Sequence, residues 1–457
     1  MLYRPYQSIH FVGIGGSGMS GIARVLRSMG YRVRGSDIKE TDTTRSLRQM
    51  GIEVLIGHRA DNLGDAQVVV VSSAIRGDNP ELREAHRRGI PVIARAEMLA
   101  ELGRLKHGVL VAGSHGKTTT TSLIATVLAH AGLDPTVIIG GRLNDLGSNA
   151  QLGMGEFLVA EADESDGSFL ALNPTIAVCT NIDREHLEYF KTLQALKDAF
   201  LSFMNKVPFY GVNVLCLEDE ALRGMLPALK RRALPYGFSE EASLRAAKVK
   251  PLRGALATEF EVRHKARRLF SLRLPLAGPH NVLNALAAVG VALELSIPSK
   301  VVKEALEGFS GIHRRLELRA VAGGIRVYDD YGHHPTEIRA TLRALRTAFP
   351  EARRLLVVFQ PHRFSRTQAL FEDFTRCFPE ADVLLLMDIY PAGEPPVKGV
   401  SSQALQQAVK TTQALYVRDH RGALQWLRKH LRPDDMVLTL GAGDVWKVAE
   451  ALAEKLR

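Results

Sequence analysis

The segment Gly113–Thr119 reads GSHGKTT and combines two glycines, a lysine and two threonines within one short stretch. It follows the apolar run Val109–Ala112, which predicts a buried strand, and it precedes a predicted helix over Thr120–Ala131. Glycines between a strand and a helix let backbone N–H groups converge on phosphate oxygens, and the helix N-terminus adds a favourable dipole. The pattern predicts a nucleoside triphosphate site, with Lys117 at the terminal phosphates and Thr118 on Mg²⁺.

This loop is shorter than the standard eight-residue phosphate loop, which requires a further glycine where the chain has Val111. A bare glycine turn followed by a chance Lys-Thr pair is the alternative interpretation. The predicted strand before the loop and the predicted helix after it favour phosphate binding.

Acidic residues and a histidine follow two further predicted strands of the same region. Glu161–Asp166 contains four carboxylates directly after the strand Phe157–Ala160, and His186 comes shortly after the strand Thr175–Thr180. Sites in open α/β sheets lie at the carboxyl ends of strands, so we expect both groups near the phosphate loop. Neighbouring carboxylates repel one another unless a cation relieves them, and Mg²⁺ beside phosphates is the natural cation. Glu161 is the predicted ligand, while a solvated acidic loop explains some of the other carboxylates.

A second glycine pattern lies near the start of the chain. Gly13–Gly18 reads GIGGSG between a predicted strand at Ile9–Val12 and a predicted helix at Met19–Met29, and Asp37 ends the next strand. This arrangement is typical of dinucleotide-binding domains, in which the acidic residue holds a ribose hydroxyl. The pattern requires only a diphosphate at a helix N-terminus, so NAD and a nucleotide-sugar diphosphate both remain open.

The last part of the chain carries two loops rich in tyrosine, histidine and arginine. Asp329–Pro335 and Gln360–Arg366 each follow a predicted strand, and two arginines stand in Gly311–Arg315. Guanidinium groups bind carboxylate or phosphate through two hydrogen bonds, so adjacent loops of this composition predict an anion pocket, with a carboxylate preferred. A transition-metal site is the alternative for the paired histidines, but its remaining ligands are missing.

Short apolar runs alternate with helical patterns along the whole chain, as a set of parallel sheets requires. We predict an α/β fold with three domains in series: Rossmann-like over 1–106, P-loop ATPase-like over 107–310 and Rossmann-like over 311–457. Within the central domain, Tyr236–Leu276 predicts short antiparallel strands. Further predicted strands are Tyr31–Arg34, Val68–Val71, Ile90–Ile93, Ile325–Tyr328, Leu355–Phe359, Val383–Met387 and Met436–Leu440.

Length and composition suit a globular protein of about three domains, since the chain has 457 residues, 46% apolar and 24% charged. The net charge of +10 comes without a nucleic-acid motif, so anionic small-molecule substrates are the better explanation. Three scattered cysteines build neither a disulfide framework nor a zinc site. With no signal-peptide pattern and no apolar run near the roughly 18 residues of a membrane span, we expect a cytoplasmic protein.

Taken together, these segments resemble the Mur ligases, the ATP-dependent amide-forming enzymes of peptidoglycan assembly. The resemblance covers the whole chain, and within the family it is most specific for the branch that adds L-alanine to UDP-N-acetylmuramate. It rests on His10–Ser20, Gly113–Thr119, Glu161–Asp166, His280–Asn284, Asp329–Pro335 and Gln360–Thr367.

The resemblance implies three binding regions: a first domain for UDP-N-acetylmuramate, a central domain for ATP, and a third domain for L-alanine. Carboxylate activation as an acyl phosphate is implied, with Mg²⁺ as cofactor, Mn²⁺ as a second option, and a monomer or weak homodimer without nucleic-acid or membrane partners. The implied UDP-sugar contacts are Gly15, Gly16, Ser17, Gly18, Met19, Ser20 and Asp37. The implied ATP contacts are Gly113, Ser114, His115, Gly116, Lys117, Thr118, Thr119, Asn281 and Arg314. The implied amino-acid contacts are Tyr331, His333, His362, Arg363 and Arg366. Lys117, Glu161 and His186 correspond to the catalytic set, and Thr118, Glu161 and His186 to metal ligands.

Two positions depart from the family pattern around the metal histidine. The family usually has aspartate where this chain has Glu185 and Glu188. An extra methylene shifts each carboxylate, which puts a supporting role for these positions in doubt.

Two other classes of function remain as alternatives. Gly13–Gly18 with Asp37 fits an NAD-dependent oxidoreductase, in which the acidic cluster and the second glycine loop have no role. A non-catalytic nucleotide switch fits the phosphate loop but leaves the two histidine- and arginine-rich loops unexplained.

Overall fold

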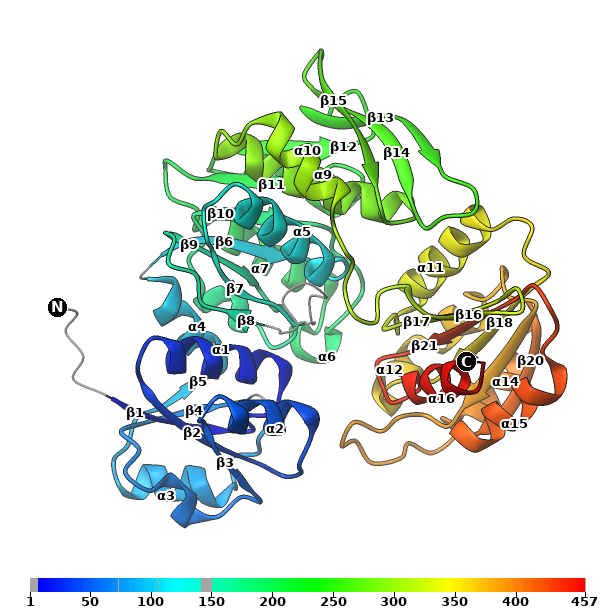
Figure 1. The fold of residues 1–457 in the computed structure, drawn as a ribbon. Helices are drawn as coiled ribbons and strands as arrows, with labels where there is room; N and C mark the ends of the chain where they lie inside the picture. The colour runs from blue at the N-terminus through cyan, green and yellow to red at the C-terminus, as the bar shows by residue number, and fades with distance from the viewer. Residues whose placement is uncertain (1–6, 73, 105, 141–149, 457) are drawn as a thin grey trace. The chain divides into compact units, whose positions relative to one another are not determined.

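The computed structural model describes residues 7–72, 74–104, 106–140 and 150–456. Its strands form three sheets of five, ten and six strands, one in each predicted domain (Figure 1). The α/β fold is confirmed. Two compact units are present: one holds residues 1–248, 260–272 and 281–310, and the other holds 249–259, 273–280 and 311–457. None of the helices in the described part of the chain has the length and apolar character that a bilayer crossing requires.

The first sheet is entirely parallel, with strand order β3-β2-β1-β4-β5. Helices α1 and α3 lie on opposite sides of it (Figure 1). The strands are β1 (Ser8–Val12), β2 (Arg32–Asp37), β3 (Glu53–Ile56), β4 (Val68–Val71) and β5 (Val92–Ala94), and the helices are α1 (Ser17–Ser28), α2 (Asp42–Gln49), α3 (Pro80–Arg87) and α4 (Arg95–Gly103).

The second sheet has the order β15-β14-β13-β12-β11-β10-β6-β9-β7-β8, and the pairs that join β6, β9, β10 and β11 are parallel. Its strands are β6 (His107–Ala112), β7 (Thr136–Ile138), β8 (Ala150–Gln151), β9 (Phe157–Glu161), β10 (Ile176–Cys179), β11 (Val212–Cys216), β12 (Ala233–Gly237), β13 (Leu244–Pro251), β14 (Thr258–His264) and β15 (Arg267–Leu274). Its helices are α5 (Lys117–His130), α6 (Leu187–Phe190), α7 (Leu193–Asn205), α8 (Glu220–Met225), α9 (Pro279–Glu294) and α10 (Ser299–Glu307).

The predicted antiparallel arrangement over Tyr236–Leu276 is wrong for its first pair, because β12 and β13 run parallel. Their pairing joins Tyr236 to Leu244 and Gly237 to Arg245 only. So short an overlap needs no crossover helix, and the connection 238–243 is sufficient.

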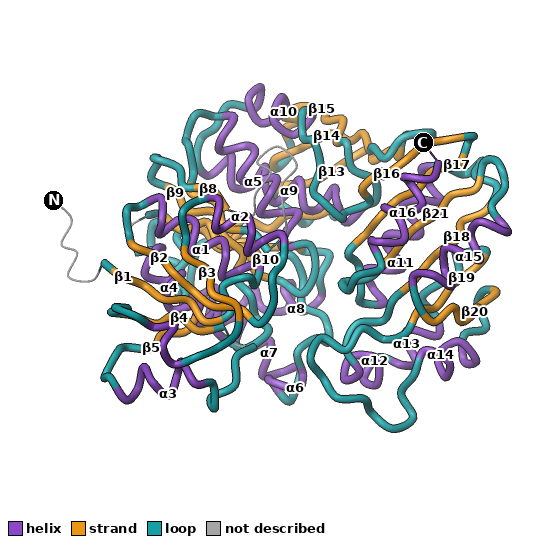
Figure 2. The backbone as a smooth tube through the Cα atoms, turned by 60° about the horizontal axis from the view of Figure 1, so that its bottom comes forward, coloured by secondary structure: helices purple, strands orange, loops and turns teal. Residues whose placement is uncertain are grey.

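The third sheet has the order β16-β17-β21-β18-β19-β20, parallel except for the antiparallel edge strand β16. Helices flank these strands in Figure 2. The strands are β16 (Glu317–Ala322), β17 (Ile325–Asp330), β18 (Arg354–Phe359), β19 (Val383–Met387), β20 (Gln413–Arg418) and β21 (Asp435–Leu440), and the helices are α11 (Pro335–Ala348), α12 (Phe364–Ala369), α13 (Phe371–Thr375), α14 (Ser402–Ala408), α15 (His420–His430) and α16 (Trp446–Leu456).

Alternation along β18 shows why this sheet is covered on both faces. Leu355, Val357 and Phe359 belong to one buried cluster, whereas Leu356 and Val358 belong to another. Successive side chains of a strand point to opposite faces, so a strand buried on both sides reads as one continuous apolar run.

Helix α5 begins at Lys117, earlier than the predicted start at Thr120. Four consecutive threonines and a serine are poor helix formers, so the sequence pattern did not predict the first turn of the helix. Thr118–Ser122 are nevertheless buried, and tertiary packing outweighs their low helix propensity. The phosphate loop therefore leads directly into the helix, with Gly116 as its N-cap in a left-handed conformation.

Candidate functional site

The loop between β6 and α5 depends on its two glycines. Gly113 has φ +140°, and a Cβ there would lie 2.0 Å from Thr180 Oγ1. Gly116 has φ +81°, and a Cβ there would lie 2.7 Å from Asn284 Oδ1. Side chains at either position would collide with the neighbouring strand end or with α9, so the tight turn requires glycine.

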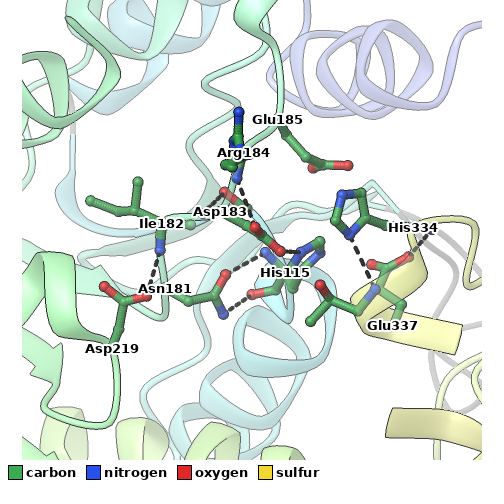
Figure 3. Close-up of polar contacts among 12 residues, drawn as sticks. His115, Asn181, Ile182, Asp183, Arg184, Glu185, Asp219, His334 and Glu337 are labelled. Atoms are coloured by element: carbon green, nitrogen blue, oxygen red, sulfur yellow. Dashed lines mark hydrogen bonds and ion pairs between the residues drawn. The ribbon is translucent and has the colours of Figure 1, made fainter. Parts of the chain in front are cut away.

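Hydrogen bonds fix this loop to the segment that follows β10. The Asn181 side chain accepts from His115 N at 2.8 Å and donates to His115 O at 3.0 Å, and His115 Nε2 lies 2.9 Å from Asp183 Oδ2 (Figure 3). Ser114 Oγ accepts from Asp183 N at 2.8 Å, and Thr180 Oγ1 donates to His115 O at 2.7 Å. These supporting roles of Asn181 and Thr180 were not predicted from the sequence, although both residues lie in the same segment as His186.

The same segment is anchored from a third element. Asp219 Oδ2 accepts from Ile182 N at 3.0 Å (Figure 3), and Asp219 Oδ1 accepts from Leu222 N at the start of α8. The loop, the β10 end and the α8 cap therefore form one hydrogen-bonded assembly.

Lys117 forms a buried ion pair beside this loop. Its Nζ lies 2.9 Å from both carboxylate oxygens of Glu164 and 2.5 Å from Gly113 O. Glu164 is fully buried. Burial alone would lower the pKa of Lys117, but the carboxylates of Glu164 and Asp163 outweigh it and raise that pKa. Lys117 is therefore a cation at neutral pH.

A histidine and a second glutamate complete the cluster around Glu164. His186 Nε2 lies 3.7 Å from Glu164 Oε1 and 3.8 Å from Glu185 Oε2. One ligand atom from each of these three residues lies within 4.8 Å of the others. His186 has φ +57°, an uncommon backbone conformation for a residue with a Cβ. The predicted proximity of His186 and the acidic segment to the phosphate loop is present in the structure.

The other two predicted metal ligands, Glu161 and Thr118, have contacts of their own. Glu161 ends β9, and its Oε1 accepts from Gly140 N at 2.8 Å. Thr118 is buried in the first turn of α5, and its carbonyl accepts from Ser122 Oγ at 2.7 Å. Among the histidines and carboxylates of the described residues, Glu164, Glu185 and His186 bring their ligand atoms together beside Lys117.

The first glycine loop, which precedes α1, has a different internal partner. Asp37 Oδ2 accepts from Gly15 N at 2.9 Å, so the carboxylate that was expected to hold a ribose hydroxyl also holds the loop. Met19 and Ser20 are buried, and a Cβ on Gly18 would lie 2.8 Å from Arg95 Nη1. Gly16 is the N-cap of α1, and the side chain of Ser17 lies outside the described part of the structure.

The described residues place Asn281 and Arg314 in different units. In α9, Asn281 Oδ1 accepts from Asn284 Nδ2 at 3.1 Å. Arg314 donates to Asp329 Oδ2 at 2.9 Å and to Gly441 O at 2.6 Å, in the other unit.

Four of the predicted amino-acid contacts are linked to one another in that second unit. Ring centroids are 5.5 Å apart between Tyr331 and His333 and 6.0 Å apart between His333 and His362, and Arg366 Nη1 lies 3.3 Å from His362 Nδ1. Burial lowers the pKa of His333 to about 3 and that of His362 to about 4. Both imidazoles are therefore neutral near pH 7 and leave the positive charge to Arg363 and Arg366.

Comparison with known families settles the class of the protein. Three models match in succession: the Mur ligase family catalytic domain over 8–107, the Mur ligase middle domain over 111–292, and the Mur ligase glutamate ligase domain over 314–443. The chain belongs to the Mur ligase family. Membership confirms the predicted resemblance and an ATP-dependent ligase, and it leaves the oxidoreductase and switch interpretations without support.

Relatives of this Mur ligase are similar over their whole length. UDP-N-acetylmuramate–L-alanine ligase from Geobacter sp. (strain M21) is 54% identical, covering 100% of this chain and 99% of the relative. The enzyme of the same name from Desulfatibacillum aliphaticivorans is 55% identical, covering 98% and 99%. The solved structure of UDP-N-acetylmuramate-alanine ligase from Thermotoga maritima is 31% identical with a TM-score of 0.84, covering 98% of each chain. A murein peptide ligase from Psychrobacter arcticus, 22% identical with a TM-score of 0.72, shares the fold.

Mur ligases require ATP and a divalent metal, and the residues at the phosphate loop of this Mur ligase fit such an ion. Glu164 and Glu185 offer carboxylate oxygens and His186 offers an imidazole nitrogen within one small volume. Mg²⁺ is bound in nucleotide sites through one or two carboxylates together with substrate phosphates and waters. From the sequence alone, Glu161 ranks first because it is closest to the strand end, and Glu185 is a departure from the family pattern. No spacing in the sequence distinguishes Glu164 from its acidic neighbours. Only its burial in the structure marks it as a candidate ligand.

Proposed function

We propose that this chain joins L-alanine to the lactyl carboxylate of UDP-N-acetylmuramate, at the expense of ATP and with release of ADP and phosphate. The observation that carries the proposal is the pairing of Lys117 with the Glu164–Glu185–His186 group at one sheet edge beside the phosphate loop. The names of full-length relatives at 54% and 55% identity support the choice of substrates. The matches to the three family models support domains over 1–106, 107–310 and 311–457.

The proposed reaction begins with phosphoryl transfer, because a free carboxylate does not condense with an amine in water. The loop N–H groups and Lys117 hold the β- and γ-phosphates, and the carboxylate of the muramate attacks the γ-phosphorus to give an acyl phosphate and ADP. Phosphoryl transfer of this kind depends mostly on positioning and on stabilising charge. A bound Mg²⁺ or Mn²⁺ supplies further charge neutralisation on the phosphates.

In the second step the neutral amine of L-alanine attacks the acyl carbon, and phosphate leaves. Arg363 and Arg366 bind the alanine carboxylate, beside Tyr331 and the neutral imidazoles of His333 and His362. Because His333 and His362 are uncharged near pH 7, they do not repel an amine or its ammonium precursor. The alanine ammonium releases a proton to solvent to give the neutral amine before the attack, and the attacking nitrogen releases a second proton as phosphate leaves. Water must be kept from the acyl carbon because it would hydrolyse the acyl phosphate.

We assign the remaining predicted contacts on the same basis. Glu164, Glu185 and His186 are the proposed metal ligands, and Glu161 and Thr118 remain candidates from the family pattern. The glycine loop 13–18 with Asp37 is the proposed UDP site, and Asn281 and Arg314 are proposed ATP contacts. A cytoplasmic protein fits these nucleotide substrates, and a monomer or weak homodimer remains a prediction.

Phosphate release tests the proposal directly. ATP hydrolysis is followed with UDP-N-acetylmuramate, with each of a panel of amino acids, with both substrates, and with neither. We expect rapid release only when UDP-N-acetylmuramate and L-alanine are both present, with an amide product of matching amount. Release that is unchanged when either substrate is omitted would refute the proposal.

A Mg²⁺ titration of activity distinguishes Glu164 from Glu161 as the metal ligand. Glu164→Gln is expected to raise the Mg²⁺ concentration for half-maximal activity by about 10-fold or more, as is typical when a ligand or its close support is lost. Glu161→Gln serves as the comparison, since its carboxylate holds Gly140 N in the structure. A larger effect at Glu161 than at Glu164 would reverse the assignment.

A further inference from the structure

Arg363, at the start of α12, has a backbone conformation that residues with a Cβ rarely adopt. Its φ is +69° and its ψ is 138°. Such a conformation persists only when surrounding contacts impose it, and outliers of this kind concentrate at ligand-binding and active sites. The contacts around Arg363 therefore indicate which residues impose this conformation and which group it positions.

The segment Tyr390–Glu394, which follows β19, holds the backbone on one side of Arg363. Arg363 N donates to Tyr390 O at 2.8 Å, and Tyr390 N donates to Pro361 O at 2.8 Å. These two bonds align the segment with residues 361–363. The Tyr390 ring also stacks on the His362 ring, with centroids 5.6 Å apart and planes only 7° from parallel.

Glu394 holds the other side. Its Oε2 accepts from Ser365 N at 3.0 Å and its Oε1 accepts from Ser365 Oγ at 2.7 Å, while Oε1 lies 4.0 Å from Arg363 Nε. Arg363 O accepts from Thr367 N and from Thr367 Oγ1 at 2.8 Å, which fixes the carbonyl as well. Hydrogen bonds thus fix the Arg363 backbone at its N–H and C=O, and Glu394 fixes the turn that follows it.

The guanidinium of Arg363 is left half-exposed, with 45% of the side chain accessible, and it extends from a rigid backbone. Arg366 lies beside the neutral His362 ring that Tyr390 covers. An exposed guanidinium suits the two-point binding of a carboxylate, and the immobilised backbone beneath it adds no backbone entropy cost to that binding.

We infer that Tyr390–Glu394 is a positioning segment for the amino-acid site: Glu394 and Tyr390 O impose the strained conformation of Arg363, and the Tyr390 ring fixes His362. The inference rests on the proposed function, in which Arg363 binds the alanine carboxylate. Neither Tyr390 nor Glu394 is assigned a contact with the substrate. Their effect passes through Arg363 and His362.

The test measures KM for each substrate separately in the full-length enzyme. Glu394→Ala is expected to raise KM for L-alanine about 10-fold or more, because a misplaced binding group costs much of its interaction. KM for ATP and for UDP-N-acetylmuramate should stay within about twofold, and kcat at saturating alanine should change little. Glu372→Ala on α13, a strongly exposed glutamate, is the matched control and should leave all three KM values unchanged.

Conservative variants keep the test informative if Glu394→Ala folds poorly. Glu394→Gln retains an acceptor for Ser365 N and should give an intermediate KM for L-alanine. Tyr390→Phe keeps the stacked ring and should behave as wild type, whereas Tyr390→Leu should raise KM for L-alanine. Equal rises in all three KM values, or no rise in any, would overturn the inference.

A double variant tests whether Glu394 acts through Arg363. Arg363→Lys alone should raise KM for L-alanine, and adding Glu394→Ala to it should produce little further change, since the two residues act as one unit. If the rise in KM for L-alanine in the double variant equals the product of the rises in the two single variants, the mechanism is contradicted. If the wild-type enzyme shows no alanine-dependent phosphate release, the proposed function fails first. If it shows that release but Glu394→Ala leaves its alanine KM intact, only the positioning inference fails.

Discussion

The glycine loops 13–18 and 113–119 both join a parallel strand to a helix, yet buried charge is used differently beneath them. Beside the second loop, the ammonium of Lys117 lies against Glu164, within reach of the candidate metal ligands. Around the first loop, Ser36 O accepts from Gly13 N and Ile14 N, and the Ser36 hydroxyl donates to the buried carboxylate of Glu81. The second loop itself contains the charged residue, Lys117. The first loop contacts Ser36, which in turn contacts the buried charge of Glu81.

The Glu81 network is closed by four donors from three other segments: β1, β2 and residues 59–62. Glu81 is fully buried and is contacted by Ser36 Oγ at 2.7 Å, His10 Nε2 at 2.9 Å, Asn62 Nδ2 at 2.6 Å and Arg59 N at 3.2 Å. Burial alone would raise the pKa of Glu81, but the hydrogen bonds from His10, Ser36 and Asn62 outweigh it and lower that pKa to about 2.

This difference assigns a structural role to Glu81 and a chemical role to Lys117. Glu81 satisfies its hydrogen bonds within the first domain, so its charge fixes β1, β2 and α3 around the glycine loop. Lys117 can exchange Glu164 for a phosphate group, because both offer anionic oxygens to the same ammonium. We therefore expect Glu81 variants to lose stability alone, and Lys117 variants to lose activity as well as stability.

The largest effect is expected for Lys117→Met. Loss of a cation that stabilises a transferring phosphoryl group should lower kcat by about 100-fold to 1000-fold, measured by phosphate release. The variant also leaves Glu164 buried without its main partner, so the free energy of unfolding should fall by about 3 kcal/mol.

The double variant Lys117→Met/Glu164→Gln sharpens this expectation. Removing both charges should restore much of the stability of the unliganded protein while activity stays low, because removing one partner of a buried pair costs more than removing both. A double variant as unstable as the sum of the two single variants would contradict an exchangeable pair.

Glu81→Gln should lower stability without the loss of activity expected for Lys117→Met. The substitution places an amide where up to four donors converge, so the free energy of unfolding should fall by about 2–4 kcal/mol in urea denaturation. The kcat of the protein that remains folded should stay close to that of wild type. Glu84→Gln on the same helix is the control, because Glu84 pairs with Arg87 and Arg88 at the surface and should cause little change.

Acid unfolding tests the same carboxylate without a mutation. A folded-state pKa of about 2 against an ordinary value of 4.5 stabilises the fold above pH 4.5, and this contribution disappears as pH falls toward 2. Between pH 5 and pH 3, Glu81 should account for a loss of about 2 kcal/mol in the free energy of unfolding. Glu81→Gln should flatten the pH dependence by that amount. An unchanged slope would show that the charge of Glu81 does not stabilise the fold.

Strong local patterns made the sheets and both glycine loops predictable. Val68–Val71 and Val383–Met387 were predicted with their observed bounds, because continuous apolar runs identify strands buried on both faces. The strands β3, β16 and β20 were not predicted. Each lies at the edge of its sheet and begins with a polar residue, so less apolar sequence marks it. The buried strand β11 was not predicted either, because Asn213 interrupts its apolar run.

The contacts around the candidate site could not be predicted from the sequence because they are long-range. Glu164 follows Glu161 by three residues, and only the fold shows that Glu164 is buried against Lys117 while Glu161 holds Gly140. His10 and Glu81 meet across 71 positions of the chain. The strained backbone of Arg363 has no sequence signature, because arginine is not a residue that predicts positive φ.

The smallest predicted effect compares two neighbouring threonines in the first turns of α5. Thr120 Oγ1 donates to Asn284 Oδ1 at 3.1 Å, whereas the buried hydroxyl of Thr121 makes no hydrogen bond with the described residues. Thr120→Val should lower the free energy of unfolding by about 1 kcal/mol, since it removes a donor from a buried acceptor that borders Gly116. Thr121→Val should leave that free energy unchanged or raise it by up to about 1 kcal/mol, since it removes an unsatisfied hydroxyl from the interior. Urea denaturation of both variants decides between them. Equal losses would mean that α9 does not support the second glycine loop through Asn284, and the loop would then depend on the β10 side alone.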